Sequence, residues 1–208
     1  MKVVILNGSP KDGDGASQRI SRALARTVGR LSDGPTITLG SPGLGAARLA
    51  ESLEGAGALA LVFPLYVDGL PSHLVDLLEG LPAAGLCGLT VYAVLNNGFW
   101  EARHNALALD ILRHFCRQKG LRWGQGLAWG GGGLIPHLSG IGRFPFKVFL
   151  QELELLSVAM MKSASGPDRF SQPSVPRFFY KASANLMWYL LALKNRIGLK
   201  TLFRRLDG

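Results

Sequence analysis

The chain has 208 residues, of which 48% are hydrophobic and 18% are charged, and it contains 27 glycines and 11 prolines. This length allows one α/β domain with a buried core, and the composition excludes a disordered polymer, a coiled coil and a collagen-like fibre. The formal net charge is +9, and most of the excess lies late in the chain, because residues 1–142 hold 12 basic and 10 acidic residues whereas residues 143–208 hold 11 and 4.

Five apolar runs predict strands, at residues 2–6, 36–39, 58–63, 89–95 and 122–129. Each run is followed by a helical pattern, at residues 17–31, 46–53, 72–81, 102–119 and 146–161. Strands that are apolar on both faces and alternate with helices are typical of a parallel sheet with helices on both sides. The chain connections between such strands are expected to be right-handed.

The amino-acid composition of the chain changes after residue 162. Residues 163–176 contain three prolines and several serines, which predicts an exposed loop or lid. An apolar helix followed by basic residues is expected beyond it, starting near Phe178. We therefore expect a main domain over 1–162 and an extension over 163–208, which is too short to form its own core and has to pack on the domain, a second subunit or a membrane surface.

Other sequence features indicate the cellular location of the protein, the state of its cysteines and whether a metal site is expected. No apolar run approaches the roughly 20 residues that cross a bilayer, and the run at 2–6 is too short for the core of a signal peptide, so a cytoplasmic protein is expected. Cys87 and Cys116 are the two cysteines, and both are expected to be buried reduced thiols. The four histidines lack metal-ligand spacing, so no metal site is expected.

The loop at residues 7–18 joins the first predicted strand to the first helix. Ligands of an open parallel sheet bind at the carboxyl ends of its strands. Here the hydroxyls of Ser9 and Ser17, the ammonium of Lys11 and the amides that open the helix could surround a phosphate. The glycine spacing fits neither the nucleoside triphosphate loop nor the dinucleotide loop. An ordinary turn capped by serine is the alternative.

Two further loops follow the strands at 58–63 and 89–95. Residues 63–71 present Tyr66 on an apolar tip, which suits a flat aromatic ligand unless the tip packs beneath a helix. Residues 96–101 combine two asparagines and a glycine with two aromatic rings, which could bind a heterocycle at its edge and face. The alternative is a capped turn with both rings in the core. The glycines at 130–133 form either a flexible connection or a surface for close ligand approach.

Taken in order, these motifs resemble the flavodoxin-like NAD(P)H-dependent FMN reductases over residues 1 to about 160. The resemblance rests on residues 5–11 with Ser17, on 63–66 with 69–71, on 97–99 and on 130–133. It implies a flavodoxin-like α/β fold: a doubly wound, five-stranded parallel sheet in three α/β/α layers, followed here by an extra C-terminal helical segment.

The resemblance also implies a cofactor-binding site. Ser9, Lys11, Ser17 and Gln18 would hold the FMN phosphate. The isoalloxazine ring would be bordered by residues of the second and third loops: Pro64, Leu65, Tyr66, Val67, Asn96, Asn97, Gly98 and Phe99. Backbone amides of these two loops could stabilise negative charge on the reduced ring. No catalytic side chain is expected, because the flavin carries the reaction.

By the same resemblance, the protein is expected to be an oxidoreductase that takes hydride from NADPH or NADH. It would pass the electrons to a small acceptor, such as a quinone, a nitro or azo compound, a metal ion or a flavin, by a ping-pong mechanism. A homodimer is expected, nucleic-acid binding is not, and the basic C-terminal helix leaves a membrane surface open as a partner. The alternatives are a flavodoxin-type electron carrier and a flavin-free interaction protein on the same fold.

Overall fold

The computed structural model describes residues 1–208 except 12, 83–85, 87, 138–139, 199–200 and 202–208, so the expectation for Cys87 lies outside the described residues. It divides into two compact units, Met1–Ser174 and Val175–Gly208. The strands are β1 (Lys2–Asn7), β2 (Thr36–Gly40), β3 (Ala56–Pro64), β4 (Thr90–Asn96), β5 (Arg122–Trp129) and β6 (Arg169–Ser171). The helices of the first unit are α1 (Ala16–Leu31), α2 (Ala46–Leu53), α3 (Ser72–Glu79), α4 (Ala106–Gln118) and α5 (Lys147–Met161), with short 3₁₀ turns η1 (Ala102–Asn105) and η2 (Gly132–His137).

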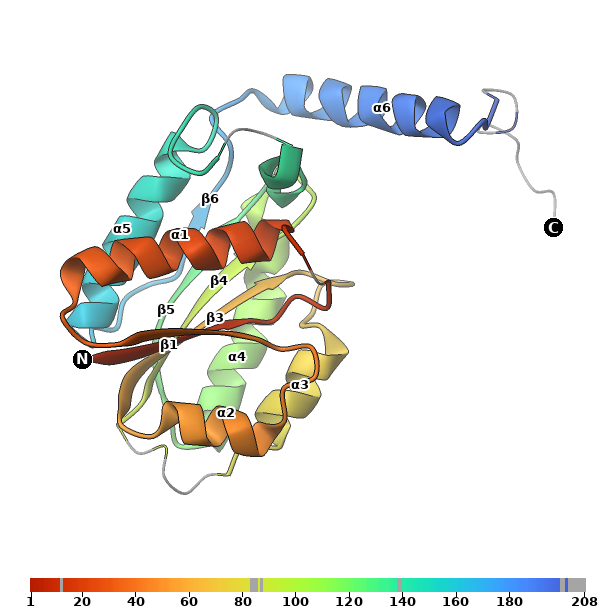
Figure 1. Cartoon of the computed structure of the whole chain (residues 1–208). Helices are drawn as coiled ribbons and strands as arrows, with labels where there is room; N and C mark the ends of the chain where they lie inside the picture. The colour runs from red at the N-terminus through yellow and green to blue at the C-terminus, as the bar shows by residue number, and fades with distance from the viewer. Residues whose placement is uncertain (12, 83–85, 87, 138–139, 199–200, 202–208) are drawn as a thin grey trace. The chain divides into compact units, whose positions relative to one another are not determined.

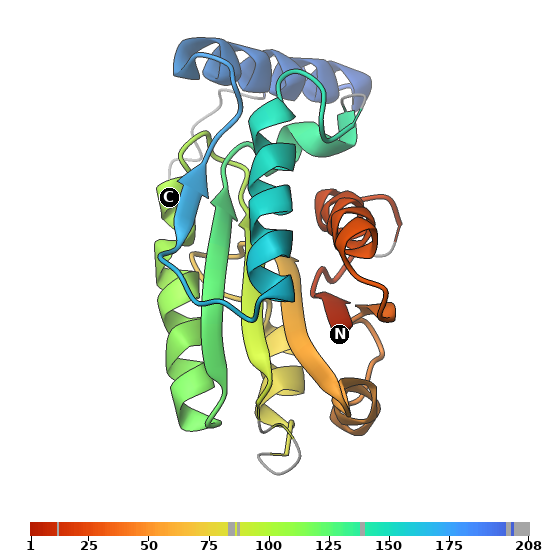
Figure 2. The same cartoon turned by 90° about the vertical axis from the view of Figure 1, so that its left-hand side faces the viewer.

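The strands of the first unit form one parallel sheet in the order β2-β1-β3-β4-β5-β6. Helices α1 and α5 lie on one face and α2, α3 and α4 on the other, as Figures 1 and 2 show. All five predicted strands and all five predicted helices of this unit are present, each within about two residues of its expected bounds, except that the helix expected at 102–119 begins as η1. The predicted doubly wound, three-layer α/β/α fold is confirmed.

Both faces of the central strands are buried, which explains their nearly continuous apolar sequences. In β1, Val3 and Ile5 pack against α1 and α5, whereas Val4 and Leu6 pack against α2, α3 and α4. All four side chains are fully buried. The sheet is therefore a rigid platform that holds the loops at its carboxyl edge.

The segment 163–176 departs from the prediction of an exposed loop. Part of it forms β6, which pairs in parallel with β5, so that the described residues form a six-stranded sheet instead of a five-stranded one. The side chain of Asp168 is 3% exposed and accepts hydrogen bonds from the Gly126 amide (2.8 Å) and the Trp123 indole (3.2 Å), and it pairs with Arg113. These polar contacts hold the strand, and no apolar run marks it. Residues up to Ser174 thus belong to the first unit, twelve beyond the expected boundary at 162.

Two titratable groups lie in the core of the first unit. Burial raises the pKa of the Cys116 thiol to about 12, which confirms the expected buried thiol at this position. Burial also raises the pKa of Tyr92 to about 12, against the opposing charge of Arg122. The Tyr92 hydroxyl donates to the carbonyl oxygens of Ala159 (3.1 Å) and Ala164 (2.8 Å). Both groups stay neutral at physiological pH.

The second unit contains α6 (Arg177–Lys194), which confirms the helix expected from Phe178. Its 18 residues make it the longest of the described helices. Across the part of the chain that the structure describes, no helix combines the length and apolarity that a membrane span requires.

Candidate functional site

A cavity of about 320 Å³ lies where the carboxyl ends of the central strands meet. β1 and β3 are neighbours in the sheet, but the chain leaves β1 toward β2 on one side and β3 toward β4 on the other. Ligands of doubly wound sheets bind at such a reversal, and the volume lies within the roughly 300–1,000 Å³ of small-molecule sites. Its walls come from four loops: Ser9, Lys11, Gly15, Ala16, Ser17, Pro64, Leu65, Tyr66, Asn96, Asn97, Gly98, Gly132, Gly133, Pro136 and His137.

Asn7, the last residue of β1, shapes the first of these loops. Its side-chain oxygen accepts from the Ser9 amide (3.1 Å), and its side-chain nitrogen donates to the Gln18 side-chain oxygen (2.7 Å). The asparagine is 6% exposed, so these bonds are shielded from water. Asn7 therefore ties both ends of the loop together. It was not among the predicted site residues, although its place between a buried strand and a glycine marks a turn.

The hydroxyl groups of Ser9 and Ser17 both face inward, at 8% and 3% residue exposure. Ser9 Oγ accepts a hydrogen bond from the Lys11 amide (3.3 Å), and Ser17 Oγ accepts one from Asn96 Nδ2 (3.1 Å). Among the described residues, neither hydroxyl donates to a protein acceptor. A hydroxyl carries one donor, so each serine retains a proton that it can donate to an acceptor in the cavity.

The same corner holds the N-terminus of α1. Gly15 is its N-cap residue, and no side chain caps the helix. The first hydrogen bond of the helix runs from the Arg19 amide to the Gly15 carbonyl (3.1 Å), so the preceding amides of residues 16–18 lie ahead of it at the positive end of the helix dipole. The nearby carboxylate of Asp14 is paired with Arg19 and Arg22. The corner thus offers hydrogen-bond donors to an anion, and Asp14, the acid of this loop that the structure describes, is neutralised by its two arginines.

The second loop brings three apolar or aromatic residues to the cavity: Pro64, Leu65 and Tyr66. Tyr66 and Gly69 exchange backbone hydrogen bonds of 3.1 and 2.9 Å around a tight turn. The turn places Val67 at φ 46° and Asp68 at φ 59°, values typical of a type I′ hairpin turn. Val67 is fully exposed and does not line the cavity.

In the third loop, the asparagine side chains are engaged within the protein. Asn96 is 3% exposed and donates to Ser17 Oγ and to the Phe63 carbonyl (3.2 Å). Asn97 accepts from the Phe99 amide (2.9 Å) and donates to the Glu101 carbonyl (3.1 Å). These groups build the loop, and the Asn96 side chain also orients the Ser17 hydroxyl.

The structure does not fit the expectation that backbone amides of the second and third loops stabilise negative charge on a reduced flavin ring. The amides of Leu65, Tyr66, Asn97 and Phe99 all donate to acceptors within the protein. Phe99 is 57% exposed, contacts the His104 ring at a tilt of 39° with ring centroids 4.5 Å apart, and does not line the cavity. These two loops therefore present side chains and glycines to the cavity, while the four amides named here already have acceptors within the protein.

Nine of the twelve predicted residues line the cavity, and Gln18, Val67 and Phe99 do not. Of the glycine run at 130–133, Gly132 and Gly133 also line the cavity. The Gly132 amide donates to the Asn97 carbonyl (2.7 Å), and a Cβ at this position would lie 2.5 Å from Asn96 Oδ1. Pro136 and His137 follow on η2 and complete the wall. His137 was not predicted, because a lone histidine after a glycine run carries no recognisable motif.

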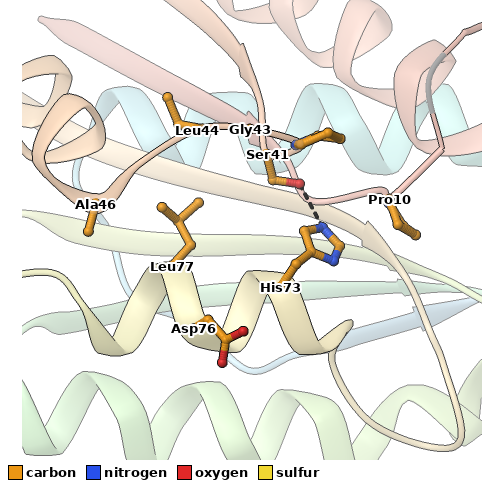
Figure 3. Close-up of a pocket in the computed structure, with 9 residues that line it drawn as sticks. Pro10, Ser41, Gly43, Leu44, Ala46, His73, Asp76 and Leu77 are labelled. Carbon is orange, nitrogen blue, oxygen red and sulfur yellow. Dashed lines mark hydrogen bonds between the residues drawn. The ribbon is translucent and has the colours of Figure 1, made fainter.

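A larger cavity of about 520 Å³ lies beside the end of β2 and the start of α3 (Figure 3). There the His73 ring is turned toward Ser41, with Nε2 2.8 Å from Oγ, while the Asp76 carboxylate points away from this pair. None of the twelve predicted residues lines this cavity. The Ser41 hydroxyl and the His73 ring are hydrogen-bonded to each other. We therefore place the candidate site in the smaller cavity, where two inward-facing hydroxyls have no acceptor in the described part of the chain.

No protein-family model and no curated protein matches the sequence. Among solved structures, the chain is similar to an apo NADH:FMN oxidoreductase, with a TM-score of 0.64, 17% identity, and 79% of this chain and 90% of the other covered. It is also similar to an FMN-dependent NADH-azoreductase from Bacillus anthracis, with a TM-score of 0.59, 13% identity, and 79% and 99% covered. A flavodoxin from Streptococcus pneumoniae gives a TM-score of 0.57, 15% identity, and 79% and 100% covered.

These likenesses define the class of fold. At identities of 13–17% they concern the backbone arrangement. The chain has a flavodoxin-like α/β fold with a sixth strand, as the resemblance of its loops implied apart from the strand number.

Proposed function

We propose that the protein is an FMN-dependent oxidoreductase that oxidises NADH or NADPH and reduces a small-molecule acceptor. The observation that carries this proposal is the pair of buried hydroxyls, Ser9 and Ser17, which donate to no acceptor among the described residues and which line the same cavity as the uncapped start of α1. The similarity of the fold to FMN-dependent oxidoreductases supports it.

The donor set fits a phosphate monoester. Both serine hydroxyls and the amides of residues 16–18 would donate to the phosphate oxygens, and Lys11 adds a positive charge at the cavity wall. Gln18 would contribute its backbone amide, because its side-chain oxygen already accepts from Asn7. The phosphate would thus be held mainly by neutral donors on a rigid corner.

The remainder of the cavity fits a flat ring. Pro64, Leu65 and Tyr66 form an apolar and aromatic wall that would exclude water from one side. A Cβ added at Gly98 or at Gly133 would have no heavy atom within 4 Å, so the cavity has open space beside the backbone at these two positions. When bound, FMN would supply the hydride-accepting and electron-donating chemistry. The chain would hold the cofactor and align the substrates.

We further propose that the nicotinamide and the electron acceptor bind one after the other at the same opening of the cavity, which gives ping-pong kinetics. The test is to load the purified protein with FMN without oxygen and to add NADH or NADPH. We expect rapid bleaching of the flavin absorption band, then reoxidation by a quinone or an azo compound, and parallel lines in double-reciprocal plots.

The alternatives give other results in the same assay. A band that bleaches only when a separate reductase is added indicates an electron carrier of the flavodoxin type. A chain that takes up no FMN, while a flavodoxin under the same conditions does, refutes the proposal and favours a flavin-free interaction protein. The homodimer implied by the family resemblance stays a prediction, which sedimentation equilibrium over a wide concentration range checks.

A further inference from the structure

Helix α6 carries an exposed apolar face. Phe179, Leu186, Leu190 and Leu193 are between 58% and 63% exposed. At about 100° per residue these four side chains fall within an arc of roughly 60° on the helix surface. Phe178, at 72% exposure, extends this face at its N-terminal end. Large apolar side chains gathered on one exposed face indicate an interaction surface.

The charge of this segment is predominantly positive. From residue 175 to the C-terminus the sequence contains seven basic residues and one acidic residue, Asp207. Of the basic residues, Arg177, Lys181 and Lys194 lie on α6 and, by helical geometry, outside the arc of the apolar face. The partner of the face is therefore expected to combine apolar and anionic character.

We propose that α6 binds the surface of an anionic lipid bilayer, lying in the interface with its apolar face toward the acyl chains. A second copy of the chain is disfavoured as the occupant, because pairing two such helices would bring basic residues together with almost no acid to balance them. Tyr189, which by helical geometry lies just beside the arc of the apolar face and whose ring has an apolar body and a polar tip, suits the headgroup region. The helix does not meet the requirements for a span, so it lies on the bilayer.

This inference is independent of the proposed reaction. It is tested by sedimentation of the full chain with vesicles of phosphatidylcholine alone or mixed with phosphatidylserine. We expect binding to the mixed vesicles at low salt, weaker binding at high salt because the attraction is screened, and little binding to neutral vesicles. Replacing Lys181 and Lys194 with Gln should weaken binding by roughly fivefold for each residue.

The apolar contribution is tested with Leu186→Glu/Leu190→Glu. This double variant should lose at least nine-tenths of the vesicle binding. Its matched control is Leu107→Glu/Leu155→Glu, which changes similarly exposed leucines of the first unit, at 57% and 51%, and should bind like the parent. Circular dichroism and thermal unfolding verify that each variant remains folded.

Three results would overturn the inference. The first is a parent chain that fails to sediment with anionic vesicles at low salt. The second is equal binding by the α6 variant and the parent. The third is a lipid-free dimer that Leu186→Glu/Leu190→Glu dissociates while the Leu107→Glu/Leu155→Glu control leaves it intact, since this would identify a second copy as the occupant of the face.

Discussion

Replacing Ser17 with Ala should separate recognition of the phosphate from recognition of the ring. In the structure, Ser17 Oγ accepts a hydrogen bond from Asn96 Nδ2 and retains its proton for the cavity. The substitution removes both functions. Asn96 Nδ2 keeps its second acceptor, the Phe63 carbonyl, so the buried amide is not left without a partner.

The two losses have different sizes. Loss of the bond from Asn96 to Ser17 should cost about 0.5–1.5 kcal/mol of folding free energy, which lowers Tm by a few degrees in a chain of this length. A hydrogen bond to a charged group contributes about 1.5–3 kcal/mol. The dissociation constant for FMN should therefore rise by roughly 10- to 150-fold.

The assay is titration of the apoprotein with FMN and with riboflavin, followed by quenching of flavin fluorescence. Because riboflavin lacks the phosphate, its affinity should change little in Ser17→Ala. Ser157→Ala is the matched control: this hydroxyl is fully buried on α5, where it donates to the Leu153 carbonyl (2.8 Å), and its loss should lower Tm without affecting FMN. Equal losses of FMN and riboflavin affinity, or unchanged FMN affinity, would refute the phosphate assignment.

Three further predictions concern stability. Gly130→Ala would place a Cβ 2.0 Å from a backbone carbonyl and should cost about 1–3 kcal/mol, whereas Gly133→Ala has open space, should keep the parent Tm, and should weaken FMN binding. Asp168→Ala leaves two donors of β5, the Gly126 amide and the Trp123 indole, without their acceptor, while Arg113 on α4 keeps Asp110, and it should lower the unfolding free energy by about 3 kcal/mol, measured by urea denaturation against the parent. Folding raises the pKa of Cys116 from 9.0 and that of Tyr92 from 10.0, both to about 12. The unfolded chain therefore loses these protons at lower pH than the folded chain, and stability should fall as the pH rises from about 9 toward 12. Cys116→Ala should make the first part of this fall less steep, as measured by denaturation curves at a series of pH values.

The order of strands and helices could be predicted because each buried strand of a parallel sheet is recognisable from a short, continuous apolar stretch of sequence. The side chains of residues 3–6 are buried on both faces of β1, and so the whole run is apolar. β6 has no such pattern, since two of its three residues are exposed and its place depends on Asp168, a single polar residue with partners some 40 to 55 positions away. Contacts of that kind leave no periodicity in the sequence.

The sequence predicted which loops form the site, but it did not predict which side chains of those loops contact one another. Parallel topology requires the carboxyl ends of β1, β3 and β4 to meet at one edge, so residue types in those loops indicate the ligand. Which side chain faces the cavity depends on local pairing. Gln18 is turned toward Asn7, and the tight turn at Val67 sends that side chain into solvent. Asn96 acts through Ser17, a pairing of residues 79 positions apart that no motif encodes.

The distribution of charge separates the two proposals physically. The anion corner at α1 uses hydroxyls and amides, and two arginines near it, Arg19 and Arg22, are paired with Asp14. Holding a phosphate there accounts for at most one cation at the cavity wall, Lys11. None of the described basic residues after residue 142 lines the cavity, and like charges in one short segment repel one another and oppose compaction. An external anionic surface would relieve this repulsion, and raising the salt concentration should weaken vesicle binding much more than it weakens FMN binding.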